Sequence, residues 1–154
     1  MQDIKIRSAR YDEPAVITLL VDVMAELSGR YGGSGDDTPV DPADFVAPHG
    51  AFFVAYTDSP HQLVGCAGWR RHGDDAELKR MFTAAATRGR GLGRRLLATI
   101  EESARGAGCK RVILETGDRQ PEAVGLYKSA GYARIDDFGH YAGHDGVLSF
   151  AKVL

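Results

Sequence analysis

The sequence of 154 residues lacks long apolar runs, and it has almost no excess of charge of either sign. Its first ten residues, MQDIKIRSAR, contain no apolar leader, and no stretch is long enough for a membrane-spanning helix. A formal net charge of −2 gives no reason to expect nucleic acid or an anionic membrane surface as a partner. We therefore expect a cytoplasmic protein with neither a nucleic-acid nor a membrane partner.

Cysteine is also scarce, with only Cys66 and Cys109 present and no CxxC spacing. This pattern argues against a disulfide framework and against a zinc site, and it fits a reducing cytosol. His140 and His144 are four residues apart, but they lie in a glycine-bearing segment outside any expected helix, so we expect no metal site. The chain length and a hydrophobic fraction of 44% predict one globular domain spanning residues 1–154.

Apolar periodicity predicts an α/β fold in which strands precede, separate and follow three helices. One helix is expected from Pro14 to about Gly29, one from about Leu92 to Gly106–Gly108, and one from Pro121 to Gly131, with a short helical turn near 41–46. The expected strands are 3–9, 51–57, 63–70, 76–83, 111–116, 133–138 and 147–153. Since a helix joins the fourth strand to the fifth, these two should be parallel, with helices on both faces of a mixed sheet.

A basic, glycine-rich turn, RGRGLGRR at 88–95, joins the fourth strand to its helix. Glycines let backbone N–H groups turn inward, and the helix start adds unpaired donors and a positive dipole end. This combination predicts an anion site, most simply for a pyrophosphate, while a plain tight turn is the alternative. A Rossmann turn would follow the first strand, and a Walker loop would place Lys-Ser/Thr after Gly93, where Arg94 stands.

The segment Arg88–Gly93 matches the Q/R-x-x-G-x-G/A motif of one family residue for residue. The runs ELKRM at 77–81 and LETG at 114–117, and Tyr127 followed by Ala130-Gly131-Tyr132, are also similar to a bacterial subgroup. Over residues 50–154 the chain thus resembles the GNAT N-acetyltransferases. The resemblance implies a mixed, mostly antiparallel sheet of six to seven strands, with a central parallel pair that splays after Met81.

The resemblance also implies acetyl-CoA as the cofactor, with coenzyme A as the product. Its pantetheine arm would pair with the backbone of Met81, Phe82 and Thr83. Its pyrophosphate would lie on the turn, with the side chains of Arg88 and Arg94 nearest to the phosphates. The residues expected to bind it there are Arg88, Gly89, Arg90, Gly91, Leu92, Gly93 and Arg94.

Two residues match catalytic positions of the family. Glu77 matches a frequent glutamate and would act as the base, through water; a structural carboxylate paired with Lys79 or an arginine is the alternative. Tyr127 matches the tyrosine that protonates the departing thiolate. The alternative is that Tyr127 is an ordinary aromatic residue that packs on the sheet. Strand alternation predicts Glu77, Lys79 and Met81 on one side and Leu78, Arg80 and Phe82 on the other.

Tyr31, Glu115 and Tyr141 are expected to line the acceptor pocket, and Glu115 also has a structural interpretation. The segment 30–37 is either a flap over the site or a plain solvated connection.

The implied reaction moves acetyl to a primary amine of a small-molecule or peptide acceptor, by direct attack in a ternary complex. A non-catalytic acyl-CoA-binding regulatory module is the alternative. A homodimer would be consistent with the family, but no residue in the sequence indicates the oligomeric state.

Overall fold

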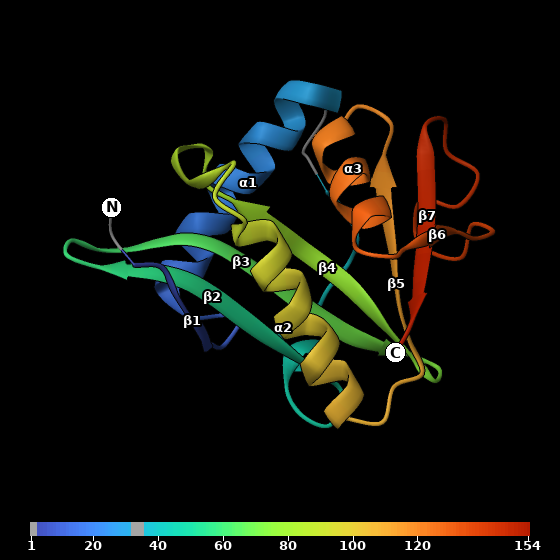
Figure 1. Cartoon of the computed structure of the whole chain (residues 1–154), viewed down its shortest axis with the longest axis horizontal. Helices are drawn as coiled ribbons and strands as arrows, with labels where there is room; N and C mark the ends of the chain where they lie inside the picture. Colours follow the sequence, from blue (N-terminus) through green and yellow to red (C-terminus); the bar gives the residue numbers. More distant parts are fainter. Residues whose placement is uncertain (1–2, 32–35) are drawn as a thin grey trace.

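The computed structural model describes residues 3–30 and 36–154 and the backbone of Tyr31. These described residues form one seven-stranded sheet with three α-helices and two short 3-10 turns (Figure 1). The strands are β1 (Lys5–Ser8), β2 (Gly50–Asp58), β3 (His61–His72), β4 (Asp75–Thr83), β5 (Arg111–Gly117), β6 (Ala133–Arg134) and β7 (Val147–Val153). The helices are α1 (Pro14–Tyr31), α2 (Leu92–Gly106) and α3 (Pro121–Ser129), and the 3-10 turns are η1 (Pro42–Phe45) and η2 (Ala85–Thr87).

The strands are arranged in the order β1-β2-β3-β4-β5-β7-β6. Neighbouring strands are antiparallel except for β4 and β5, which α2 connects as a parallel pair. The predicted α/β fold, with one central parallel pair in a mostly antiparallel sheet, is confirmed.

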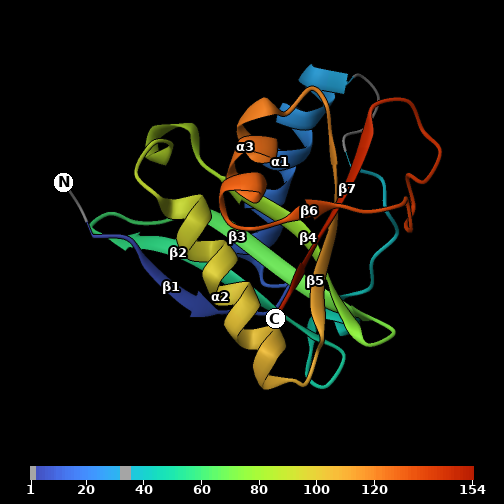
Figure 2. The same cartoon turned by 45° about the vertical axis from the view of Figure 1, so that its right-hand side comes forward.

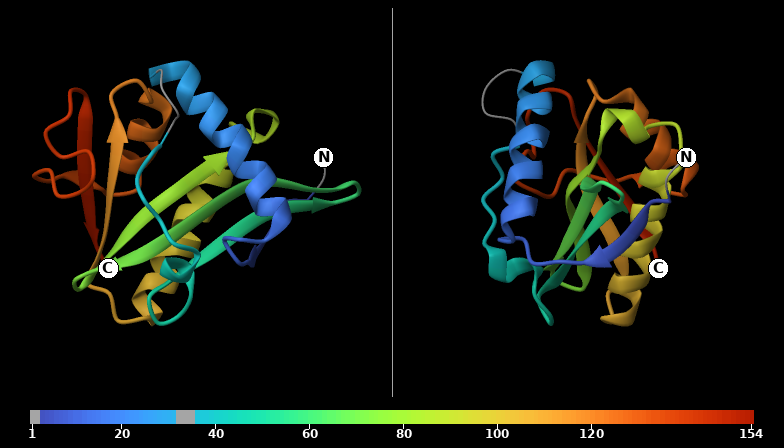
Figure 3. Two further views of the ribbon diagram at one scale, coloured as in Figure 1. Left: turned by 180° about the vertical axis from the view of Figure 1, so that it is seen from behind. Right: turned by 90° about the vertical axis from the view of Figure 1, so that its left-hand side faces the viewer.

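Helices cover both faces of the sheet, so the protein has two apolar layers. In Figure 3, α1 lies on one face and α2 on the other. Leu96, Ile100 and Ala104 of α2 are fully buried against the sheet, at the spacing that predicted this helix. On the opposite face, Val16 of α1 and Phe45 of η1 pack over β2 and β3 in a second core.

The parallel strands β4 and β5 separate after a short stretch of pairing. The parallel ladder consists of Ala76 opposite Val112 and Glu77 opposite Ile113. Beyond Glu77 the two strands diverge, as the ribbons in Figures 1 and 2 show. The splay therefore begins earlier than the predicted position after Met81, because pairing ends at Glu77.

The predicted alternation of β4 is wrong beyond Lys79. The β3–β4 register shifts between Cys66 and Gly68, and Arg80 has a left-handed φ of 57°. This bulge adds a residue to β4, so Lys79 and Arg80 both reach the α1 face, where Thr38 accepts hydrogen bonds from each. Met81 consequently joins the α2-side core, and Phe82 joins the α1-side core.

The predicted strand 133–138 is also wrong in length, because β6 contains only Ala133 and Arg134. The chain leaves the sheet near Asp137, whose carboxylate accepts hydrogen bonds from the Gly143 N–H (3.1 Å) and the Ser149 hydroxyl (3.3 Å). These bonds stabilise the 139–146 loop instead of a longer strand. Among the described residues, no helix has the length and apolar character needed to cross a bilayer.

Candidate active site

A cavity of about 780 Å³ occupies the gap between β4 and β5 and continues to the start of α2 and to α3. Its volume lies within the range of roughly 300–1,000 Å³ that is typical of ligand sites. Of the predicted site residues, it is lined by Met81, Phe82, Thr83, Arg88, Gly89, Gly91, Leu92, Gly93, Arg94, Glu115, Tyr127 and Tyr141. Glu77 and Arg90 are not among the lining residues, and the side chain of Tyr31 lies outside the described part of the chain.

The glycine-rich turn presents backbone donors to this cavity. Gly89 and Gly91 adopt left-handed φ values of 79° and 78°, which favour glycine. The carbonyl of Gly91 accepts the first hydrogen bond of α2, from the Arg95 N–H at 3.1 Å. In the chain as described, the N–H groups of Leu92 and Gly93 have no backbone acceptor. The helix start therefore has the donors and the positive dipole end of an anion site.

The two arginines expected at the phosphates already have partners within the protein. Arg88 donates to both carboxylate oxygens of Glu26 on α1, at 2.6 and 2.8 Å, and its guanidinium lies 5.7 Å from the Phe82 ring centre. Arg94 donates to the Ser129 hydroxyl at 2.6 Å. Helices α1 and α3 thus hold these cations at the edge of the cavity.

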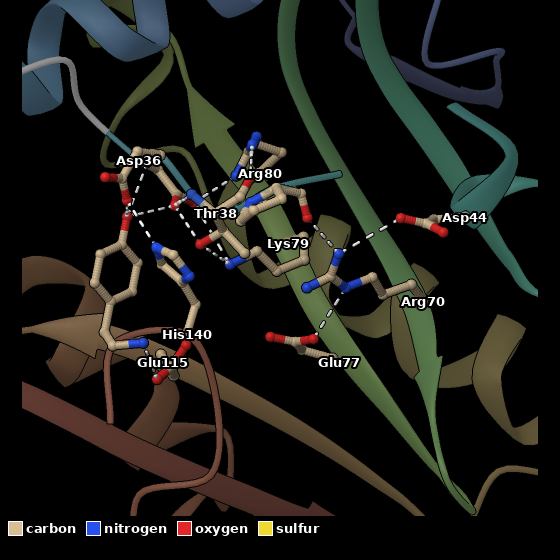
Figure 4. Close-up of polar contacts among 12 residues, drawn as sticks. Asp36, Thr38, Asp44, Arg70, Glu77, Lys79, Arg80, Glu115 and His140 are labelled. Atoms are coloured by element: carbon tan, nitrogen blue, oxygen red, sulfur yellow. Dashed lines mark hydrogen bonds and ion pairs between the residues drawn. The ribbon is translucent and has the colours of Figure 1, made fainter. Parts of the chain in front are cut away.

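Glu77 points to the α1 face, and it is not among the residues that line the cavity. Its carboxylate accepts a hydrogen bond from Arg70 Nε at 3.0 Å, and Glu77 is only 3% exposed. Arg70 also donates to the Pro39 carbonyl at 2.8 Å and lies 3.5 Å from Asp44 (Figure 4). This placement favours the structural interpretation of Glu77, as a strand carboxylate paired with a neighbouring arginine, and it does not support contact with an amine.

Glu115 on β5, in contrast, lines the cavity. The Tyr141 N–H donates to Glu115 Oε2 at 3.0 Å, whereas Oε1 is buried and has no hydrogen-bond partner in the described structure. Burial raises the pKa of Glu115 above its usual range, and the negative charge of Glu77 adds to the shift, although the Tyr141 N–H and the charge of Lys79 oppose it. A partly buried carboxylate with a raised pKa is suited to accept a proton.

Tyr127 on α3 also lines the cavity. It is buried, and its ring packs near the rings of Tyr132 and Phe150, with centroid distances of 5.8 and 6.4 Å. Its hydroxyl forms no hydrogen bond with any residue that the structure describes. Burial raises the pKa of Tyr127, so the phenol keeps its proton at neutral pH.

A buried polar cluster closes the α1 side of the cavity. Its centre is Asp36, which lies 2.6 Å from Arg80 Nη1 and 3.6 Å from Lys79 Nζ. Although burial alone would raise the pKa of Asp36, these two cations hold it well below its usual range. This role of Asp36 could not be read from neighbouring residues, because Asp36 follows a glycine-rich segment and its partners depend on the bulge in β4.

The cavity fits an extended, diphosphate-bearing thioester. The edge of β4 that faces β5 has no ladder partner from Leu78 onward within the described residues, so it can pair with a chain-like amide. The start of α2, at the end of that edge, offers N–H groups to an anion. A splayed parallel pair that leads to a glycine-rich helix start defines the class of acyl-CoA-dependent acyltransferases.

Comparison with known proteins identifies the family. Residues 20–132 match the acetyltransferase (GNAT) family model, and the chain belongs to this family of N-acetyltransferase enzymes, which use acyl-CoA. The resemblance that the glycine turn indicated is thus confirmed.

Relatives and solved structures agree with this assignment. The chain is 34% identical over 131 residues to an IAA acetyltransferase of Azospirillum brasilense, covering 84% of each protein. It is 36% identical over 109 residues to the N-alpha-acetyltransferase RimI of Mycobacterium tuberculosis, covering 66% of this chain and 65% of RimI. The same fold occurs in an acetyltransferase from Streptococcus agalactiae, with a TM-score of 0.76, 22% identity and full coverage of both chains. It also occurs in the PaiA N-acetyltransferase from Thermoplasma acidophilum in complex with coenzyme A, with a TM-score of 0.71, 17% identity and 99% coverage of both.

Proposed function

We propose that residues 1–154 act as one domain that transfers the acetyl group of acetyl-CoA to a primary amine, by direct attack in a ternary complex. The observation that carries this proposal is one cavity that combines a free strand edge, a set of backbone N–H donors and the side chains of Glu115 and Tyr127. Family membership supports the same reaction class.

Acetyl-CoA supplies an activated thioester to this reaction. The backbone of Met81–Thr83 would hold the pantetheine arm and polarise the thioester carbonyl through N–H groups, as an oxyanion hole does. The N–H groups of Gly91, Leu92 and Gly93 would hold the diphosphate, with Arg88 and Arg94 beside it. Arg90 belongs to the same turn, so we keep it in the proposed set of cofactor-binding residues.

Glu115 takes the place of Glu77 as the proposed base. An alkyl amine has a pKa of about 10.4, so it arrives protonated at neutral pH and must lose a proton before it can attack. Glu115 has a raised pKa and lines the cavity, where its carboxylate would take the proton of the amine directly or through water. Tyr127, protonated at neutral pH, is the proposed acid for the leaving thiolate.

The test is to incubate the purified protein with acetyl-CoA and a panel of primary amines while thiol release and acetylated products are measured. We expect thiol release that requires the amine and matches the acetylated product one to one. Saturable binding of acetyl-CoA without transfer to any amine would instead favour the non-catalytic regulatory module.

Glu26 should weaken the binding of the cofactor. Its carboxylate accepts hydrogen bonds from the Arg88 guanidinium and places a negative charge at the phosphate end of the cavity. Glu26→Gln should therefore strengthen the binding of acetyl-CoA about threefold, the scale of a partly exposed ion pair. Calorimetric titration of the variant and the parent protein at the same ionic strength measures this change.

The matched control is the same substitution in a chain that already carries Arg88→Gln. If Glu26 acts by holding Arg88, most of the gain disappears in the double variant. A Glu26→Gln protein that binds acetyl-CoA no better than the parent would show that this ion pair does not compete with the cofactor.

A further inference from the structure

Two segments that are distant in the sequence meet on the α1 face of the cavity. One is the strap, residues 36–40, which crosses this face of the sheet after α1 (Figure 3), and the other is the 139–146 loop. The Tyr141 hydroxyl lies 2.7 Å from Asp36 Oδ1 and accepts a hydrogen bond from the Asp37 N–H at 2.9 Å. His140 Nε2 lies 3.0 Å from Asp37 Oδ1. Contacts between side chains, and a hydrogen bond from the backbone to a side chain, therefore join the strap to the loop.

The strap is also fixed to the sheet beneath it. Arg80 donates to the Thr38 carbonyl at 2.9 Å and to Asp36 at 2.6 Å, and Lys79 donates to the Thr38 hydroxyl at 3.0 Å (Figure 4). The side chains of Lys79 and Arg80 are each only 5% exposed. Moving the strap would leave these two buried cations without their partners, which is costly in a protein interior.

The 139–146 loop lies directly against the proposed base. The Tyr141 N–H donates to Glu115 Oε2, and a Cβ built on Gly139 would lie 2.5 Å from Glu115 Oε1. The loop backbone thus covers Glu115 on the same face on which the strap covers Lys79. Tyr141 bridges the space between the strap and the loop, next to the position that an acceptor amine would occupy at Glu115.

We infer that the acceptor is a small free amine and not the end or side chain of a peptide, because the bridge between the strap and the loop blocks the path of a continuing chain. A peptide must extend away from its reacting amine on at least one side, whereas a small molecule fits within the cavity. This inference rests on the proposed acetyl transfer and narrows its acceptor class.

The experiment compares matched acceptors with the full chain and acetyl-CoA. One pair is alanine amide against a hexapeptide that begins with alanine, and another is N-acetyl-lysine amide against a hexapeptide with one internal lysine. A wider panel of free amines includes amino acids, amino sugars, diamines and arylalkyl amines. We expect the best free amine to exceed every peptide in kcat/KM by at least about 30-fold, the equivalent of breaking one charge-assisted hydrogen bond.

Tyr141→Phe keeps the ring and the N–H to Glu115 but removes the hydroxyl that joins the strap to the loop. The ratio of free-amine to peptide kcat/KM should fall about tenfold in this variant, because the bridge is weakened. Asp37→Ala removes the Asp37 carboxylate that contacts Tyr141 and His140, and it should lower the ratio in the same direction. Tyr56→Phe, on β2 and outside the cavity lining, is the matched control and should leave the ratio unchanged.

Three results would overturn the inference: a peptide turned over as well as the best free amine, turnover of peptides but of no free amine, or an unchanged ratio in both strap variants. Failure of the proposed function itself is distinguishable, because neither free amines nor peptides would then be acetylated, whether or not the protein binds acetyl-CoA.

Discussion

Replacing Glu115 by Gln should lower kcat/KM for the amine about 1,000-fold, within the range that a general base contributes. Glutamine keeps an oxygen for the Tyr141 N–H but cannot take a proton from the amine. Steady-state thiol release at saturating acetyl-CoA measures the loss. In the parent protein, kcat/KM should decrease as the pH falls through the raised pKa of Glu115, because the protonated carboxyl no longer accepts a proton.

The stability of the same variant separates catalysis from structure. A carboxyl whose pKa is raised on folding disfavours the native state above its unfolded pKa of about 4.3, so removing the charge relieves this penalty at neutral pH. We therefore expect the Tm of Glu115→Gln to stay equal or rise at pH 7. Glu102→Gln, at an exposed site on α2, is the matched control for both measurements. A fall in Tm together with retained turnover would assign Glu115 a structural role.

Replacing Tyr127 by Phe should lower kcat about 100-fold, because the variant loses the proton donor for the thiolate. A thiolate is a fairly good leaving group, so some activity should remain. The KM for acetyl-CoA should change little, since the ring still packs near Tyr132 and Phe150. Single-turnover measurements with a fixed amine test this difference between kcat and KM.

Tyr132→Phe is the matched control for this prediction. The Tyr132 hydroxyl bonds to Glu101 at 2.9 Å, and the residue packs in the core outside the cavity lining. Loss of the Tyr132 hydroxyl should therefore lower the Tm, and it should lower kcat by no more than a few-fold. If Tyr127→Phe behaves in the same way, then Tyr127 only packs against the sheet and another group protonates the thiolate.

The glycine-rich turn and the helix start that follows it could be predicted from the sequence because their signals are local. The three glycines, the following arginines and the four-residue spacing of Leu92, Leu96 and Ile100 all lie within a short segment. Local backbone conformation and helix periodicity decide such a site, and both can be inferred from neighbouring residues. The same holds for the order of helices and strands, which is confirmed by the fold.

Glu115 and Tyr141 were expected in the cavity, but the polar contacts around them could not be predicted, because they join distant segments. Glu77 and Glu115 are both strand glutamates in the sequence, and only the position of Arg70 and the splay of β5 distinguish them. The bulge at Arg80 turns two consecutive cations to one face, which alternation alone does not allow. The partner of those cations, Asp36, follows a segment without hydrophobic periodicity, and its contact with Tyr141 joins residues 105 positions apart.

Calorimetric titration of the full chain with acetyl-CoA, without any amine, tests the central claim most directly. We expect saturable binding of one acetyl-CoA per chain at concentrations below about 100 μM, which corresponds to the affinity of an ordinary cofactor site. The binding should weaken with added salt, since the phosphates meet N–H groups and arginines. Absence of binding at high micromolar acetyl-CoA would contradict the assignment of this cavity.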